Sequence, residues 1–149
     1  MIRTGLILAA CLACVACEGR ADGPSMPGQP AAYVGDVVGN GHCVPFVQEV
    51  AGVPRTAEWS PGAVVRGNHD LPPGTPIATF EADGTYASRT GSHAAIYIGQ
   101  DQNGLWVYDQ WKGQPVHKRL IRFKGGLGAK SGSKSNDGTR YRVIEFRGA

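Results

Sequence analysis

Residues 94–109 constrain the fold of this chain more than any other segment. Residues 94–98 read AAIYI and residues 105–109 read LWVYD, so both runs are rich in apolar, β-branched and aromatic side chains. Residues 101–104 between them read DQNG, and these residue types favour tight turns. Two such runs separated by turn residues predict a β-hairpin of two antiparallel strands.

One α-helix is predicted upstream of the hairpin, over residues 43–52. Phe46, Val47 and Val50 are spaced so that a helix carries them on one face, and Gly52 provides a stop. Around these elements the sequence predicts turns at 59–62 and 71–75, strands at 76–80, 116–123 and 140–146, and a flexible glycine-, serine- and lysine-rich loop at 124–139. A helix followed by antiparallel strands predicts an α+β domain, in which the N-terminal helix packs on an antiparallel sheet.

The N-terminus has the pattern of an export signal. Residues 1–16 contain Arg3, no acidic residue, and an apolar run that is too short for a stable membrane span. Residues 17–32 are polar and rich in proline and glycine, which predicts a flexible tether. The folded domain is then expected over residues 33–149. We therefore expect an exported protein with one folded domain.

Two outcomes of export fit this leader. Cys17 follows Val15 and Ala16 as in the cleavage box of a bacterial lipoprotein, which would place a lipid on Cys17. Cys11 follows a box of better sequence, but after a very short apolar run. Ordinary cleavage, for instance after Ala21, would instead release a soluble protein. The expected location is the periplasm, with or without a lipid anchor to a bacterial membrane, or the medium after secretion.

Cys43 is the only cysteine after residue 17, and it stands at the start of the predicted helix after the sequence Gly39-Asn40-Gly41-His42. An exported protein usually pairs its cysteines, but Cys43 has no partner within the expected domain, so its free thiol calls for another explanation. A helix N-terminus lowers the pKa of a thiol, and flanking glycines let the backbone approach a substrate closely. Cys43 is therefore a candidate nucleophile. The alternative is a small core residue.

A nucleophilic thiol needs a base, and the base needs an orienting group. His93 directly precedes the first hairpin strand, and Asp109 ends the second. A five-residue loop over 99–103 would place His93 opposite Asp109 on one face of the sheet. A two-residue turn at 103–104 would instead place His93 opposite Gln114. The sequence leaves both registers open.

Five further residues are candidates for roles near this site. Trp111 adjoins the expected site and is the best candidate to line a substrate groove. Tyr33, Asn40 and His42 are weaker candidates, each as a side chain that would contact the substrate or the developing oxyanion. His117, on a later strand, is the fallback for the third residue of the site.

Metal and nucleic-acid binding find little support. A zinc site made by Cys43, His93 and His117 would lack the paired ligand spacing of known zinc motifs, so neither a metal nor another cofactor is expected. The formal net charge is +3, and no basic run is longer than residues 117–119. The repeated basic and aromatic pattern of nucleic-acid-binding proteins is missing.

Four segments resemble parts of a known family of cysteine hydrolases. Residues 41–47, GHCVPFV, resemble the Gly-x-Cys-x-x-aromatic-Val entry of the CHAP branch of papain-like peptidoglycan hydrolases. Residues 92–99, SHAAIYIG, are similar to the Gly-His-Val-Ala-Ile-Tyr-Ile-Gly strand of CHAP-type and NlpC-type enzymes. Residues 73–78 resemble the Pro-Gly-Asp-Leu-Val strand that precedes that histidine, and residues 107–111 stand where CHAP proteins carry Glu-x-Asn. The resemblance covers residues 33–123.

The resemblance implies a papain-like NlpC/CHAP fold and a peptidoglycan amidase or endopeptidase. Cys43 would be the nucleophile, His93 the general base and Asp109 the orienting group. The reaction would hydrolyse an amide bond in a stem peptide or cross-link through an acyl-enzyme. The chain departs from the family pattern because Asp109 replaces the CHAP glutamate, Trp111 replaces the asparagine, and the Asp-Cys-Ser-Gly signature of NlpC enzymes is absent.

Two other functions remain open at this level. The chain could be a non-catalytic exported module that binds the cell wall on the same fold, with Cys43 as a relic. It could also be an acyl- or peptidyl-transferase that uses the same three residues. Whether an inhibitor or immunity protein restrains the activity is left open.

Overall fold

The computed structural model describes residues 28–125 and 133–146. The predicted signal peptide and the sites considered for its cleavage or acylation, Cys17 among them, lie outside these ranges. The described chain begins at Gly28, whose N–H donates a hydrogen bond to the carbonyl oxygen of Val50. Within the two described ranges, no helix combines the length and apolar character that a membrane crossing needs.

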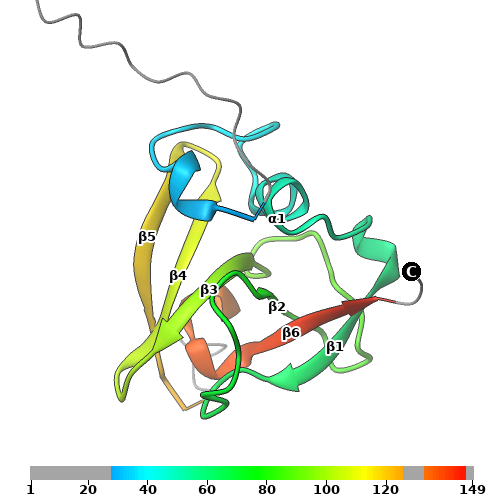
Figure 1. The fold of residues 1–149 in the computed structure, drawn as a ribbon. Coiled ribbons are helices and arrows are strands. Elements are labelled where there is room, and N and C mark those ends of the chain that lie inside the picture. The colour runs from blue at the N-terminus through cyan, green and yellow to red at the C-terminus, as the bar shows by residue number, and fades with distance from the viewer. Residues whose placement is uncertain (1–27, 126–132, 147–149) are drawn as a thin grey trace, which may run out of the picture.

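Six antiparallel strands form one sheet in the order β1–β6–β2–β3–β4–β5 (Figure 1). The strands are β1 (Trp59–Val64), β2 (Pro76–Thr79), β3 (Ala94–Gln100), β4 (Gly104–Trp111), β5 (Gln114–Arg122) and β6 (Tyr141–Phe146). Short 3₁₀ helices are η1 (Pro30–Tyr33), η2 (Thr56–Glu58), η4 (Lys134–Asn136) and η5 (Gly138–Arg140). With one α-helix in the described residues, the predicted α+β class is confirmed.

The α-helix is α1 (Cys43–Ala51), and it packs against β3 and β4 (Figure 1). Phe46, Val47 and Val50 are buried against the apolar face of the sheet, as their spacing predicted. Gly52 ends the helix in the left-handed conformation, with φ of +64°, which glycine adopts without steric cost. The predicted helix is therefore confirmed, and Cys43 is its first residue.

The turn predicted at residues 59–62 is wrong, because this segment begins strand β1. Among the described strands, β1 lies at the edge of the sheet and pairs with β6. Pro61 lacks a backbone N–H, and an edge strand tolerates this loss on its unpaired side. Trp59 anchors the strand, since its ring is buried and its indole N–H donates to the carbonyl oxygen of Pro54 at 2.8 Å.

The hairpin of β3 and β4 is confirmed, but in neither of the two registers considered. A three-residue connection joins the strands, and Ile96 pairs with Tyr108, with a shift in register between Tyr97 and Gly99. Continued towards the start of β3, this register makes His93 a diagonal neighbour of Asp109. Long side chains bridge such diagonal positions on one face of a sheet.

The segment predicted as a flexible loop folds in its described C-terminal part. Residues 133–140 contain η4 and η5 and lie next to β5. Asp137 is fully buried there, and its Oδ1 accepts hydrogen bonds from the backbone N–H groups of Lys124 and Thr139. The composition of the segment gave no sign of this buried carboxylate. As a result, the chain after β5 returns to the sheet close to His93 and Arg119.

Candidate active site

The backbone before α1 places Cys43 at the helix N-terminus. His42 is the N-cap residue with an extended conformation, and its side chain makes no capping bond. Gly39 and Gly41 have φ of +55° and +83°, a region that other residues rarely adopt. A Cβ on Gly39 would lie 2.7 Å from the Cβ of Pro45, so a larger residue here would push the loop away from the helix. Cys43 is half-buried and free.

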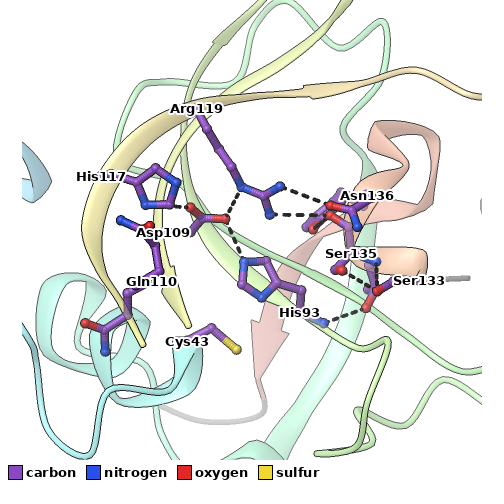
Figure 2. A network of polar contacts seen from close by, with 12 residues as sticks. Cys43, His93, Asp109, Gln110, His117, Arg119, Ser133, Ser135 and Asn136 are labelled. Atoms are coloured by element: carbon purple, nitrogen blue, oxygen red, sulfur yellow. Dashed lines mark hydrogen bonds and ion pairs between the residues drawn. The ribbon is translucent and has the colours of Figure 1, made fainter. Parts of the chain in front are cut away.

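His93 and Asp109 form a buried pair beside the helix start (Figure 2). The Nε2 of His93 lies 2.7 Å from Oδ2 of Asp109. The backbone N–H of His93 donates to Oγ1 of Thr79, which fixes the chain at the entry to β3. His93 is 5% exposed and Asp109 is fully buried. The structure thus brings together the three residues predicted for catalysis, Cys43 included.

The three groups shift one another's pKa towards the charged forms. Burial lowers the pKa of His93, but the hydrogen bond to Asp109 and the interaction with Cys43 outweigh it and raise that pKa to about 9. Burial raises the pKa of Asp109, yet His93 and then Arg119 hold it below its usual range. Burial likewise raises the pKa of Cys43, whereas the hydrogen bond and charge of His93 bring it below the ordinary value of a thiol. These shifts favour a thiolate beside an imidazolium over a neutral thiol beside a neutral imidazole.

Tyr86 is a polar neighbour of Cys43 that the sequence did not reveal. Its hydroxyl oxygen lies 3.7 Å from Sγ of Cys43. The ring is held by Trp59 and Phe80, with ring centroids 4.9 and 6.4 Å away. Burial, followed by the charge of Cys43, raises the pKa of Tyr86, so its phenol stays protonated and can donate a hydrogen bond. Tyr86 lies in a polar loop with no strand or helix pattern, which explains why local sequence gave no signal.

Arg119 of β5 is a second residue that sequence reasoning missed. Its Nε donates to the same oxygen of Asp109 that contacts His93, also at 2.7 Å (Figure 2). Its other nitrogens reach Oδ1 of Asn136 at 3.2 Å and the carbonyl oxygen of Ser135 at 3.5 Å. Strand alternation places residues 117 and 119 on one face of β5. This alternation was the available signal in the sequence, because it places Arg119 on the same face as His117, the fallback residue for the site.

His117 and Trp111 lie at the rim of the same group. His117 faces Asp109 across the β4–β5 pairing, with its Nδ1 3.7 Å from Oδ1 of Asp109. Trp111 is 41% exposed and packs edge-on against His117 at 4.9 Å and His93 at 6.4 Å. The guanidinium of Arg119 lies 5.0 Å from the Trp111 ring. The predicted groove residue is therefore beside the site, and its substrate role stays a prediction.

The other three predicted binding residues lie in less direct positions. Tyr33 is buried against Phe46, and its hydroxyl has no hydrogen-bond partner in the described residues. Asn40 is exposed and accepts from the backbone N–H of His42 at 3.1 Å. The side chain of His42 is exposed as well. Contacts with substrate stay predictions for all three.

Gln110 connects the loop before α1 to the strand that carries Asp109. Its amide is fully buried and accepts from the N–H of Val38 at 3.0 Å. It also donates to the carbonyl oxygens of Val38 and His42, at 2.8 and 2.7 Å. The residue just before Cys43 is thereby tied to the residue just after Asp109. Sequence reasoning passed over Gln110 because its partners are 68 and 72 positions away.

Replacing Gln110 with alanine is expected to lower the free energy of unfolding by about 2 to 3 kcal/mol, because three backbone groups lose their buried partner. Urea unfolding followed by circular dichroism measures this loss. Gln102→Ala is the matched control, since Gln102 is exposed in the hairpin connection. Equal stability of the two variants would show that Gln110 does not hold the loop.

The described residues contain no cluster of three or more His, Cys, Asp or Glu side chains arranged to hold a metal ion. The polar side chains of the site pair with one another, since His93 and Arg119 both contact Asp109. They form an ion-pair network that reaches the Cys43 thiol through His93.

A thiol at a helix start, beside a histidine oriented by a buried carboxylate on an antiparallel sheet, is the arrangement of enzymes that transfer acyl groups through cysteine. The family model for domesticated amidase effector 2 (Dae2) matches residues 20–144. The chain belongs to this family.

Two curated relatives and one solved structure are similar over most of the chain. The Type VI secretion amidase effector 2 protein of Salmonella typhi is 43% identical over 112 residues, which are 71% of this chain and 80% of the relative. Domesticated amidase effector 2 of Ixodes scapularis is 34% identical over 110 residues, or 70% of each chain. The structure of Type 6 secretion amidase effector 2 (Tae2) superposes with a TM-score of 0.66 at 37% identity, covering 75% of this chain and 86% of that one.

Proposed function

We propose that this protein is an amidase that hydrolyses amide bonds in peptidoglycan peptides through a covalent acyl-enzyme on Cys43. Membership of the amidase effector family supports the reaction class. The cysteine mechanism is supported chiefly by the position of His93 between Cys43 and Asp109. Burial raises the pKa of Cys43, but the hydrogen bond and charge of His93 outweigh burial and lower that pKa. The resemblance of the cysteine and histidine segments to CHAP-type enzymes supports a papain-like fold and peptidoglycan as substrate.

The proposed reaction has two halves. In the first, the Cys43 thiolate attacks the carbonyl carbon of the amide, the C–S bond forms, and the C–N bond breaks as His93 gives its proton to the leaving nitrogen. In the second, neutral His93 takes a proton from water, the water oxygen attacks the thioester, and the C–S bond breaks. Asp109 holds the imidazole in position and stabilises its protonated form throughout.

The oxyanion of each tetrahedral intermediate needs hydrogen-bond donors near Sγ. Cys43 is the first residue of α1, so the backbone N–H groups of Cys43 and Val44, at the start of this helix, are proposed donors to the oxyanion. The protonated hydroxyl of Tyr86, 3.7 Å from Sγ, is a second proposed donor to the oxyanion. Asn40 and His42 remain proposed contacts for the substrate rather than for the oxyanion, and Trp111 a proposed wall of its groove.

Peptidoglycan lies outside the cytoplasmic membrane, so this function requires the export that the leader predicts. We propose the periplasm as the site of action, either through a lipid on Cys17 or after simple cleavage. We also propose that an inhibitor or immunity protein protects cells that make the enzyme, because the Salmonella typhi relative is named an effector.

Incubation of the purified protein with peptidoglycan sacculi tests this function. Separation of the soluble products should give new muropeptides whose masses correspond to hydrolysis of one amide bond. Unchanged muropeptides together with tight retention on sacculi would overturn the proposal in favour of a binding module. Products heavier by an added amine, in place of water, would favour a transferase.

Replacing Tyr86 with phenylalanine is expected to lower kcat by about 10-fold to 100-fold, since a donor to the oxyanion is lost. The same change should move the pH midpoint of Cys43 alkylation upward, because the hydrogen bond from Tyr86 helps to lower the pKa of Cys43. Rates with muropeptides and with iodoacetamide measure the two effects. Tyr108→Phe, on the core side of β4, is the matched control and should change neither rate.

A further inference from the structure

A cavity of about 390 Å³ opens beside His93, and it has no role in the proposed mechanism. Its lining residues are Ser92, His93, Trp111, Arg119, Ser135 and Asn136. Cys43 is not among them. Figure 2 shows Arg119, Ser135 and Asn136 on the side of the His93 ring that faces away from Cys43. The cavity therefore adjoins the proton donor of the reaction but not its nucleophile.

This position assigns the cavity to one half of the substrate. During amide cleavage the acyl half becomes bonded to Cys43, while the leaving nitrogen must approach His93 to receive its proton. A cavity that touches His93 and not Cys43 consequently receives the leaving half. This step rests on the proposed hydrolysis by Cys43.

The charges around the cavity favour an anion. Asp109 carries one negative charge and contacts two cationic side chains, His93 and Arg119, each at 2.7 Å. With the Cys43 thiolate included, the four groups carry two positive and two negative charges. Of these groups, however, His93 and Arg119 line the cavity, and none of the lining residues is acidic. The guanidinium has five N–H groups, of which three reach Asp109, Asn136 and Ser135. Two therefore have no partner in the part of the chain that the structure describes, and we propose that they bind the ligand. Trp111 packs against the guanidinium, which lies 5.0 Å from the centroid of its ring.

We propose that this cavity binds a free carboxylate on the leaving half of the substrate, with Arg119 as its charged donor. The amine released by the enzyme would then come from a residue whose carboxylate is neither amidated nor in peptide linkage. Ser92 and Asn136 also line the cavity and supply neutral hydrogen-bonding groups. Binding of this carboxylate would orient the leaving nitrogen towards His93.

A matched pair of substrates tests the assignment. The muropeptide that the protein cleaves is prepared in two forms, with the carboxylate nearest the leaving nitrogen either free or converted to a carboxamide. The wild-type protein should cleave the free form about 10-fold to 100-fold faster in kcat/KM. Equal values for the two forms would overturn the carboxylate site and leave the proposed function intact. Failure to cleave any muropeptide would overturn the function itself.

Two variants locate the effect at the cavity. The ratio of kcat/KM for the two substrates cancels any general loss of activity within each variant. In Arg119→Gln this ratio should fall towards one, and Asn136→Asp should lower it as well, because it places an anion 3.2 Å from the guanidinium. Asn103→Asp, in the distant hairpin connection, adds the same charge and should keep the wild-type ratio. A wild-type ratio in Asn136→Asp and Arg119→Gln would show that the carboxylate binds elsewhere.

Discussion

Replacing Cys43 with alanine is expected to remove hydrolysis of peptidoglycan peptides, with kcat lowered by about four to six orders of magnitude. No acyl-enzyme can form without the thiol, and only the binding groups and oxyanion donors remain. Release of soluble muropeptides from sacculi measures the loss. The wild-type protein should in addition accumulate a mass adduct on Cys43 when a slow substrate is quenched in acid, and the variant should not.

Cys43→Ser is the matched variant, because it keeps the size of the side chain. His93 cannot hold a serine as an alkoxide, so this variant should be as inactive as Cys43→Ala. Both should keep their fold, since loss of one sulfur costs about 1 kcal/mol. Thermal unfolding by circular dichroism checks this point. Muropeptide release by a folded Cys43→Ala protein would exclude the cysteine mechanism, whereas equal binding of sacculi by all three proteins would leave the amidase proposal untouched.

The helix and the central hairpin could be predicted because their apolar spacing is local. Phe46, Val47 and Val50 mark one helix face whatever the rest of the chain does, and AAIYI and LWVYD mark two strands. The hairpin register could not be predicted in the same way. A shift between Tyr97 and Gly99 moves the pairing by one residue, and nothing in the residue types fixes where such a shift occurs.

The contact of His93 with Asp109 nevertheless survives this difference in register. A diagonal pair on one face of a sheet lies within reach of an imidazole and a carboxylate, so the side chains compensate for the change in pairing. A contact between two such side chains can therefore be predicted correctly from sequence even where the predicted strand register is wrong.

The rest of the site depends on contacts between segments that are far apart in the chain. Arg119 reaches Asn136 and Ser135 because residues 133–140 fold back against β5, which the glycine- and serine-rich composition did not indicate. Tyr86 reaches Cys43 from a loop without periodicity. Polar segments contribute such residues through turns and buried hydrogen bonds, and neither leaves a periodic pattern in sequence.

The same reasoning explains the error at β1. Pro61 and Gly62 are typical of turns, and a turn is the ordinary interpretation of Trp-Ser-Pro-Gly. An edge strand accepts both residues, but only the completed sheet shows that this segment lies at an edge. Edge position is a property of topology, so local residue types could not have indicated it.

Replacing His93 with glutamine is expected to lower kcat by about four orders of magnitude and to make Cys43 much less reactive. Burial raises the pKa of Cys43, and the contact with His93 is what brings it below the ordinary value. Without that contact burial prevails, so the thiolate fraction at pH 7 falls. Alkylation by iodoacetamide at this pH should slow, since even an unshifted thiol is only a few per cent ionised there and burial lowers that fraction further.

The pH profile separates this role from a merely structural one. In the wild-type protein, activity should fall as pH drops through the lowered pKa of Cys43, because the thiolate takes up a proton. It should also fall as pH rises through about 9, where His93 loses the proton that the leaving nitrogen needs. His93→Gln should lose the alkaline limb, while His69→Gln, in an exposed loop, should keep the whole profile. An unchanged alkylation profile in His93→Gln would show that His93 does not ionise the thiol.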